Sequence, residues 1–369
     1  MMCCNIVVSS ALEQTNYPSS RFSPVTLLLK VDPPNPDIGA IKTAAQIIKS
    51  GGLVAFPTET VYGLGANALD GAAVKKIYKA KGRPSDNPMI VHIADRKALA
   101  QIAEATPAAQ KLIDVFWPGP LTIVLKKKKV VPKETTGGLN TVAVRMPDHP
   151  VALALIRAAG VPIAAPSANL SGKPSPTKAA HVIEDFNDKI DCIIDGGSSR
   201  IGLESTVLDL TSDIPTILRP GFVTPDDVKD VLGAVAVHPG AMGAVSEQNA
   251  KSPGMKYCHY APKAKMILFE GRREAVLECI AAEVAARKEK NIGVLLFDDI
   301  QEIPKDTKIL VGAGAAGVET QCRIYDALRE FDSRGAELIL AQGIAPEGFG
   351  LAIMNRLRRA AGFNIVRVD

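Results

Sequence analysis

Short apolar runs alternate with amphipathic helical segments along most of the chain, and this alternation restricts the fold more than any other feature of the sequence. In the segment 38–50, apolar residues recur at helical spacing from Ile41 to Ile48, and Gly51 follows, which predicts a helix and its end. The apolar run Leu53–Pro57 comes next and has the length of a buried strand. Such alternation is typical of an α/β fold, in which helices cover a sheet, and excludes a helix bundle and a β-sandwich.

The length of 369 residues corresponds to two or three domains of ~150 residues each. The stretch 237–262 differs from its surroundings, because loop-forming His-Pro-Gly and Ser-Pro-Gly triplets enclose a polar segment. A second series of predicted strands and helices follows, with a Rossmann-like layout but no GxGxxG fingerprint. We therefore predict a loosely ordered N-terminal tail over 1–37, an α/β domain over 38–236, a linker over 237–262 and a smaller Rossmann-like α/β domain over 263–369.

The net charge of +4 is unevenly distributed along the chain. Residues 38–236 contain 23 basic and 19 acidic side chains, whereas residues 263–369 contain 16 of each. This excess predicts that an anionic ligand binds to the first domain. It is too small to indicate a general nucleic-acid surface.

The cysteines and the apolar stretches indicate a cellular compartment. The six cysteines include no CxxC pair, and no uncharged apolar stretch approaches the ~20 residues that a membrane span needs. The first basic residue is Arg21, so the N-terminus lacks the charged region of a secretory signal. We therefore expect a reduced, cytoplasmic protein that does not contact a membrane.

The segment Lys79–Pro88 concentrates cations with amide and hydroxyl groups in a predicted loop after a helix. Lys81 and Arg83 are two positions apart, so both can reach one anion, and the arginine fork suits a phosphate or a carboxylate. A solvated charged loop is the usual alternative for such a run. Pro84 and Pro88 stiffen this loop, however, and therefore favour an anion site.

Polar residues also follow several predicted strands, the position at which ligands bind to α/β sheets. Thr60 follows the run Leu53–Pro57, and Arg145 and Arg219 each end a predicted strand. Either arginine alone would be read as a surface salt bridge of little energetic value. Together with the basic loop they indicate one cationic site. Further candidates lie in two loops, Ser167 and Asn169 in the first and Ser205 in the second.

Several common catalytic arrangements are excluded by the sequence. It contains no GxSxG elbow and no Walker A motif, and its five histidines lack metal-ligand spacing. His92 is the histidine that we expect in a site, because it lies in a predicted strand after the basic loop.

Four stretches occur in a specific order: FPTETVYGLGAN, KAKGRPSDNPMIVHI, RMPDHP with APSANLSGKPSPT, and GLESTVLDL with ILRPG. They closely resemble the YrdC-like domain of the threonylcarbamoyl-AMP synthase family, over about 38–236. The linker SPGMKYCHYAP and the segment after it look like the two-domain form of that enzyme. The resemblance implies a twisted open sheet with helices, followed by the smaller Rossmann-like domain.

The resemblance also implies a reaction. L-Threonine, bicarbonate and ATP would give threonylcarbamoyl-adenylate, pyrophosphate and water. Mg2+ would accompany the ATP, and the sequence does not identify protein ligands for this metal. A partner transferase complex would then place the threonylcarbamoyl group on a tRNA adenosine beside the anticodon, and a weak direct contact with tRNA is compatible with the charge.

By analogy with the family, Lys81 and Arg83 are the catalytic residues. The resemblance assigns threonine and its carbamate to Thr60, His92, Arg145, Ser167 and Ser205. It assigns the nucleotide to Lys81, Arg83, Asn87, Thr141, Asn169, Thr177, Arg219 and Tyr260.

The linker is expected to close over the nucleotide as a lid, through Tyr257 or, by preference, Tyr260, and to exclude water from a hydrolysable product. Cys258 departs from the family pattern, in which we expect a basic residue at this position.

Three other functions remain open at this point, one of which is a regulatory threonine sensor that would bind threonine without turnover. A carbamoyl-transfer maturation factor of hydrogenases also contains a YrdC-like domain, but it would need an acylphosphatase segment and paired CxxC zinc sites, which the sequence lacks. An RNA-binding module without catalysis would bind with an affinity that falls steeply with salt and does not depend on ATP.

Overall fold

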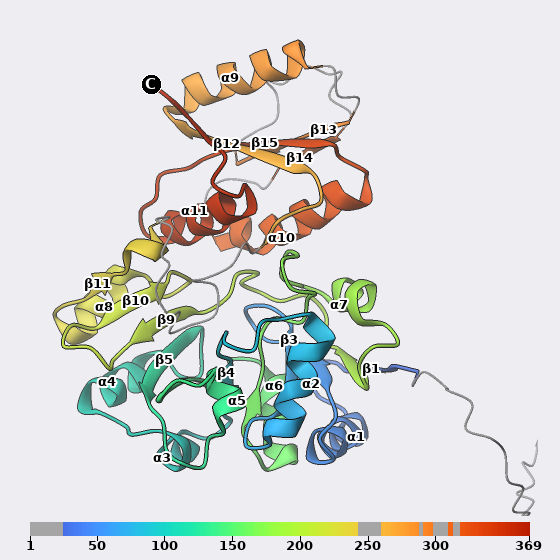
Figure 1. Ribbon diagram of the computed structural model, residues 1–369, viewed down its shortest axis with the longest axis vertical. Helices are drawn as coiled ribbons and strands as arrows, with labels where there is room; N and C mark the ends of the chain where they lie inside the picture. The colour runs from blue at the N-terminus through green and yellow to red at the C-terminus, as the bar shows by residue number, and fades with distance from the viewer. Residues whose placement is uncertain (1–24, 243–259, 288–290, 298–308, 313–317) are drawn as a thin grey trace, which may run out of the picture.

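The computed structural model of the chain (Figure 1) describes residues 25–242, 260–287, 291–297, 309–312 and 318–369. These residues form two α/β units, each built around its own sheet. The smaller unit lies above the larger one in Figure 1, and its helices α10 (Val318–Ser333) and α11 (Phe349–Ala360) lie between the two sheets. The predicted α/β fold class and the order of a larger and a smaller α/β unit are therefore confirmed.

The first sheet has eleven strands in the order β1-β8-β2-β3-β7-β4-β6-β5-β9-β10-β11 and mixes parallel with antiparallel pairs. Apolar runs form the central strands of this sheet. Most side chains of these strands are buried, whichever face of the sheet they lie on. The strands are β1 (Leu27–Lys30), β2 (Val54–Phe56), β3 (Gly63–Asn67), β4 (Ile90–His92), β5 (Leu121–Lys126), β6 (Thr141–Arg145), β7 (Ile163–Ala164), β8 (Cys192–Asp195), β9 (Thr206–Asp209), β10 (Thr216–Arg219) and β11 (Ala236–Val237).

Helices cover both faces of this sheet. The apolar stripe of α1 (Ile38–Lys49) packs with α6 (Pro150–Ala159) on one face, and α2 (Gly71–Lys81) belongs to the core on the other. The remaining helices of this unit are η1 (Arg96–Ala98), α3 (Leu99–Ile102), α4 (Pro107–Phe116), α5 (Lys133–Thr136), α7 (Ala179–Phe186), α8 (Pro225–Leu232) and η2 (Pro239–Ala241).

The ends of α2 explain how the basic loop is placed. The Asp70 side chain accepts hydrogen bonds from the first-turn amides of the helix, and Gly82 ends it with a left-handed backbone at φ 61°. Lys81 is consequently the last helical residue, and the chain turns sharply after it toward Arg83.

The second sheet is entirely parallel in the described residues, with the order β14-β13-β15-β12-β16. Its outer face carries α9 (Arg273–Ala286), and its inner face carries α10 and α11 (Figure 1). This doubly covered parallel sheet is the predicted Rossmann-like layout. Its strands are β12 (Lys265–Gly271), β13 (Ile292–Leu296), β14 (Ile309–Gly312), β15 (Leu338–Gln342) and β16 (Ile365–Val368).

The predicted boundaries differ from the structure at two places. Leu27–Lys30 was expected in a loose tail, but it pairs with β8 and Val31 is buried. The isolated segment gave no signal, because its hydrogen-bonding partner lies far along the chain. At the other end, β11 and η2 continue the first unit past residue 236. Residues 1–24, and 243–259 of the predicted linker, lie outside the described residues.

Among the described helices, none combines the length and the apolar character that crossing a membrane requires.

Candidate active site

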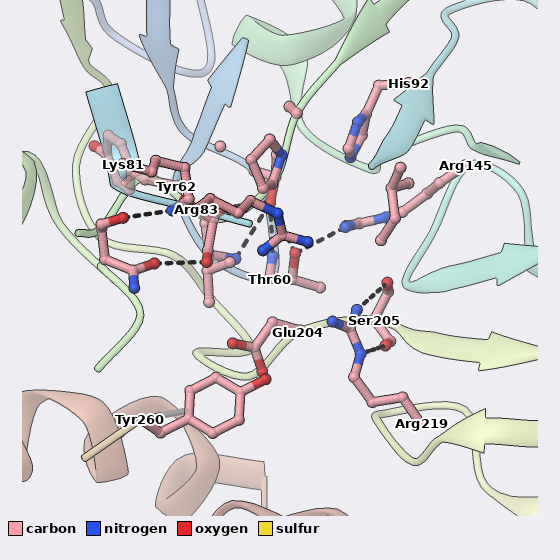
Figure 2. A pocket seen from close by; sticks show the side chains of 18 of the residues that line it. Thr60, Tyr62, Lys81, Arg83, His92, Arg145, Glu204, Ser205, Arg219 and Tyr260 are labelled. Atoms are coloured by element: carbon pink, nitrogen blue, oxygen red, sulfur yellow. Dashed lines mark hydrogen bonds between the residues drawn. The ribbon is translucent and has the colours of Figure 1, made fainter. Parts of the chain in front are cut away.

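One cavity of the first unit gathers polar side chains from the carboxyl ends of its strands (Figure 2). The loop after β2 supplies Thr60, and the ends of β4, β6 and β10 supply His92, Arg145 and Arg219. Tyr260, near the C-terminal end of the predicted linker, also lines the cavity. The full lining consists of Thr58, Thr60, Val61, Tyr62, Gly63, Lys81, Arg83, Ile90, His92, Arg145, Ala165, Pro166, Ser167, Asn169, Ser171, Glu204, Ser205, Arg219 and Tyr260.

The buried guanidinium of Arg145 organises one side of the cavity. Its Nη1 donates a hydrogen bond of 2.9 Å to Thr60 Oγ1, and its Nε donates one of 3.1 Å to the Gly119 carbonyl. Its Nη2 lies 2.6 Å from Glu59 Oε2. Three partners therefore fix the plane of the arginine fork, and the Glu59 carboxylate neutralises its charge.

His92 lies beside this arginine and is buried. Burial, with the nearby positive charge of Arg145, lowers the pKa of His92 to about 3, so the imidazole is neutral at physiological pH. Its Nδ1 has no hydrogen-bond partner within the described residues. A neutral ring in this position can accept a hydrogen bond from a ligand, or donate one to it, without adding charge to the site.

Lys81 and Arg83 come from the end of α2 and the turn after it. The Lys81 ammonium donates to the carbonyl oxygens of Ser167 and Asn169. The Arg83 guanidinium donates to the Asn87 carbonyl at 3.3 Å and to the Pro88 carbonyl at 3.0 Å. Both cations thus hold neutral oxygens, and their charge is not cancelled by these contacts.

Burial shifts the titration of both cations. It lowers the pKa of Lys81 well below the ordinary range, and the nearby Arg83 charge acts in the same direction. Burial likewise lowers the pKa of Arg83 to about 10, which leaves the guanidinium charged at neutral pH. An anionic ligand would favour the charged forms and thereby bind more strongly.

Arg219 and Ser205 form the opposite wall. Arg219 Nε donates 3.1 Å to the Ser205 carbonyl, and Nη2 donates 3.2 Å to Ser205 Oγ. The Ser205 hydroxyl also lies 2.7 Å from Thr122 Oγ1. Like the two cations on the other wall, Arg219 is held by neutral oxygens.

The loop after β7 adds hydroxyl and amide groups to the cavity. Ser167 Oγ donates 2.6 Å to Asn169 Oδ1, and the Asn169 amide group donates to the carbonyls of Leu170 and Lys173. The backbone carbonyls of the same two residues accept the hydrogen bonds from Lys81, so this loop is joined to the end of α2.

Three predicted site residues lie outside the cavity lining. Asn87 is a buried residue of the basic loop itself, and Thr141 begins β6 at the end away from the cavity. Thr177 Oγ1 donates a hydrogen bond of 2.9 Å to Asp326 of α10. The other ten predicted residues line it: Thr60, Lys81, Arg83, His92, Arg145, Ser167, Asn169, Ser205, Arg219 and Tyr260.

Glu204 is the charged lining residue that the sequence reasoning missed. Its position next to Ser205 in the GLEST stretch was the available signal. A carboxylate was not expected in a site for anions, and two of its partners, Tyr325 and Arg356, lie in the second unit. Tyr257 and Cys258 lie outside the described residues, so the lid stays a prediction.

The arrangement suits the binding of a polyphosphate. Three cations with neutral partners converge on one cavity, next to a neutralised arginine, a neutral imidazole and several hydroxyl groups. Such preorganised donors can stabilise charge that develops on a transferring phosphoryl group. In the described part of the chain, no three His, Cys, Asp or Glu side chains are grouped to hold a metal ion.

Comparisons with known proteins cover both units. The Sua5, YciO and YrdC family model, described as "Telomere recombination", matches residues 46–221. The model described as "Threonylcarbamoyl-AMP synthase, C-terminal domain" matches residues 223–362.

The threonylcarbamoyl-AMP synthase of Pyrococcus abyssi is 52% identical over 331 residues, which cover 89% of this chain and 96% of the relative. The chain belongs to the threonylcarbamoyl-AMP synthase family. The Bacillus subtilis member is 49% identical over 332 residues, covering 89% of this chain and 94% of the relative. The family resemblance predicted from the four motifs is thereby confirmed.

A solved structure supports the same assignment. The crystal structure of P. abyssi Sua5 complexed with L-threonine matches with a TM-score of 0.88 and 49% identity, and covers 93% of this chain and 100% of that chain. Membership of the synthase family through both units favours a synthase over the maturation factor and over an RNA-binding module without catalysis.

Proposed function

We propose that this chain synthesises threonylcarbamoyl-AMP from L-threonine, bicarbonate and ATP, with release of pyrophosphate, as a nucleotidyltransferase. The observation that carries the proposal is the convergence of Lys81, Arg83 and Arg219 on one cavity beside Arg145 and Thr60. The cavity combines a cationic wall for phosphates with a neutral, hydrogen-bonding wall for an amino acid. Membership of the synthase family supports the same reaction.

The reaction needs no protein nucleophile. The threonine amine forms a bond to the carbon of bicarbonate, and water leaves to give a carbamate. A carbamate oxygen then attacks the α-phosphorus of ATP, the bond from that phosphorus to the bridging oxygen breaks, and pyrophosphate departs. Catalysis consists of holding the two reactants in line and neutralising the phosphate charge.

The two walls divide this work. Thr60, His92 and Arg145 form the threonine side, to which Ser167 and Ser205 add hydroxyl groups. The nucleotide side consists of Lys81, Arg83, Asn169, Arg219 and Tyr260. Each preorganised donor of this kind can contribute roughly 3–4 kcal/mol to the stabilisation of the transition state.

Mg2+ enters this proposal as part of the substrate. Phosphate oxygens and water are the ligands that Mg2+ prefers in nucleotide sites. The carboxylate of the cavity, Glu204, is occupied by Ser175, Tyr325 and Arg356. We therefore infer that Mg2+ arrives bound to the phosphates of ATP.

The product is a mixed anhydride that water hydrolyses, and a second enzyme must consume it. We propose that a tRNA threonylcarbamoyl transferase complex takes it up in the cytoplasm, the compartment expected from the cysteine pattern, as the second step of threonylcarbamoyl-adenosine formation beside the anticodon. A weak contact with tRNA is part of this proposal. A salt titration of tRNA binding would test it, because phosphate contacts weaken with salt.

Pyrophosphate release tests the synthase activity. The purified chain is incubated with ATP, Mg2+ and bicarbonate, with L-threonine, with L-serine or without an amino acid. We expect release that requires both threonine and bicarbonate, together with an adenylate of threonylcarbamoyl mass. Release that ignores threonine, or the absence of an adenylate, would contradict the proposal.

A further inference from the structure

Two buried side chains of the second unit reach the wall of the cavity. Tyr325 of α10 and Arg356 of α11 are both fully buried, at 0% exposure. The Tyr325 hydroxyl lies 3.0 and 2.9 Å from the two Glu204 oxygens, and Arg356 Nε lies 3.0 Å from Oε2. Ser175 Oγ of the first unit completes the set at 2.5 Å from Oε1.

Arg356 also holds a second loop of the first unit. Its Nη1 donates 2.8 Å to the Pro220 carbonyl. Glu204 directly precedes Ser205, and Pro220 directly follows Arg219. One guanidinium therefore joins both chain segments on which the Ser205–Arg219 pair of the cavity is mounted.

A third contact extends to Tyr260 in the lining of the cavity. The Arg356 guanidinium carbon lies 5.8 Å from the centre of the Tyr260 ring, within the range of a cation–π contact. The Tyr260 and Tyr325 rings are 5.3 Å apart, centre to centre. Figure 2 shows the Tyr260 ring beside Glu204, to the left of Arg219.

The buried carboxylate of Glu204 requires Arg356 as a partner for its charge. Burial alone would raise the pKa of Glu204, but Arg356, Arg219 and the Ser175 hydroxyl outweigh it and lower the pKa to about 2. Glu204 is therefore ionised at the wall of a site for phosphates. Without Arg356, its charge would repel the polyphosphate and compete for Arg219.

We propose that Arg356 is a positioning residue for the nucleotide side of the active site. It acts through Glu204 and Pro220 on Ser205 and Arg219, and it makes the second unit a structural part of that wall. The inference rests on the synthase activity proposed above and goes beyond it, because none of the predicted site residues lies in this unit.

Steady-state kinetics of the full chain test the role. In Arg356→Gln we expect kcat/KM for ATP to fall roughly 100-fold, because an unpaired carboxylate is left in the wall. In Arg356→Lys the charge stays but the fork is lost, and we expect a fall of about tenfold. Threonine binding, measured by calorimetry without ATP, should weaken less than about threefold, since Ser205 is the one threonine-side residue next to Glu204 and the main contacts, Arg145 and Thr60, are untouched.

Arg358→Gln is the matched control. Arg358 lies on the same helix and pairs with Glu270 of β12 at 2.6 and 3.1 Å, and it also donates to the Met242 carbonyl. None of these partners lines the cavity. We expect kcat/KM for ATP to stay within about twofold of the wild type.

The double variant Glu204→Gln/Arg356→Gln guards against a simple loss of folding. It leaves no unpaired charge, so we expect it to unfold at a higher temperature than Arg356→Gln while its KM for ATP remains raised. Wild-type KM for ATP in both Arg356→Lys and the double variant would overturn the proposal. Equal losses for ATP and threonine would also overturn it, because they indicate a structural role only.

The proposed activity and this inference fail in different ways. If the wild-type chain forms no adenylate, the proposed function is wrong. The positioning role can still be tested in that case, by comparing the ATP affinities of Arg356→Lys and the wild type in calorimetry. Equal ATP affinities in that comparison would overturn the positioning role.

Discussion

The cations of the cavity and the cations of the interface between the two units differ in their partners. Lys81, Arg83 and Arg219 donate to carbonyl and hydroxyl oxygens, and among the residues that the structure describes no carboxylate forms an ion pair with them. At the interface, Arg329 instead lies 2.8 Å from the buried carboxylate of Asp185, and Arg356 pairs with Glu204.

This difference distinguishes cations that are available to bind a ligand from cations that join the two units through ion pairs. A buried cation without a counter-ion lowers the stability of the fold, and it is retained where a ligand supplies the missing charge. A buried ion pair is neutral and depends on both partners. The same residue types therefore predict opposite effects of substitution at the two places.

Substitution of Lys81 should give the largest effect on activity. Lys81→Met removes a cation of the nucleotide side, and we expect kcat/KM to fall by about 10³-fold. The melting temperature should stay equal or rise, because burial disfavours the charged ammonium. Pyrophosphate release and thermal unfolding are the measurements. A marked drop in melting temperature would show that Lys81 is structural and would remove the contrast.

Substitution of Asp185 should act in the opposite sense. Its two oxygens lie 2.6 Å from Lys173 Nζ and 2.8 Å from Arg329 Nη2. Asp185→Asn removes the buried counter-ion that both cations share and leaves them only the exposed carboxylate of Glu184, so we expect a loss of about 3 kcal/mol in the free energy of unfolding. Asp148→Asn, in an exposed pair with Arg200, should change it by less than about 0.5 kcal/mol. Equal losses in the two variants would contradict this reading.

Arg145 is the cavity cation that does have a carboxylate partner, and its substitution sharpens the comparison. Arg145→Lys cannot bond to Thr60, Gly119 and Glu59 together, so we expect KM for threonine to rise about tenfold. KM for ATP should change little, and the melting temperature should fall, unlike that of Lys81→Met. A larger change for ATP than for threonine would place Arg145 on the other side of the cavity.

The smallest effect concerns His181, whose Nε2 lies 3.2 Å from Asp326 Oδ1 at the interface. Burial, followed by the Arg329 charge, lowers the pKa of His181 to about 4, although Asp326 opposes the shift. Between pH 6.5 and 4 the unfolded chain binds a proton that the folded chain does not, so stability falls as the pH falls through this window.

His181→Gln should remove this contribution. The difference in melting temperature between the wild type and the variant should shift by a few degrees from pH 7 to pH 4.5, against the wild type. His92 titrates in the same direction but is present in both chains, so it cancels from the difference. A difference that does not depend on pH would exclude His181 as a titrating group.

The sequence was most informative where local rules decide the structure. The basic run after a predicted helix indicated the site of Lys81 and Arg83, and the strand ends predicted Arg145 and Arg219. Partners distant in the chain were not predictable in this way. Glu204 and Arg356 are 152 positions apart, and no periodicity or motif joins them.

Thr177 is a second residue whose partner could not be predicted from the local sequence. It came with the family resemblance as a nucleotide ligand, but in the structure its hydroxyl bonds to Asp326, which is 149 positions away. A helix of the second unit thus competes for a side chain that the local sequence places in a loop of the first.

The pairing of β1 with β8 sets an order of events during synthesis. Thr26 Oγ1 bonds to the Ile190 carbonyl, 164 positions later. A ribosome that adds ~5–20 residues per second needs roughly 8–30 s to make that stretch, and a strand without its partner exposes apolar surface and unpaired backbone groups throughout. This edge of the sheet is therefore completed only after β8 has emerged from the ribosome.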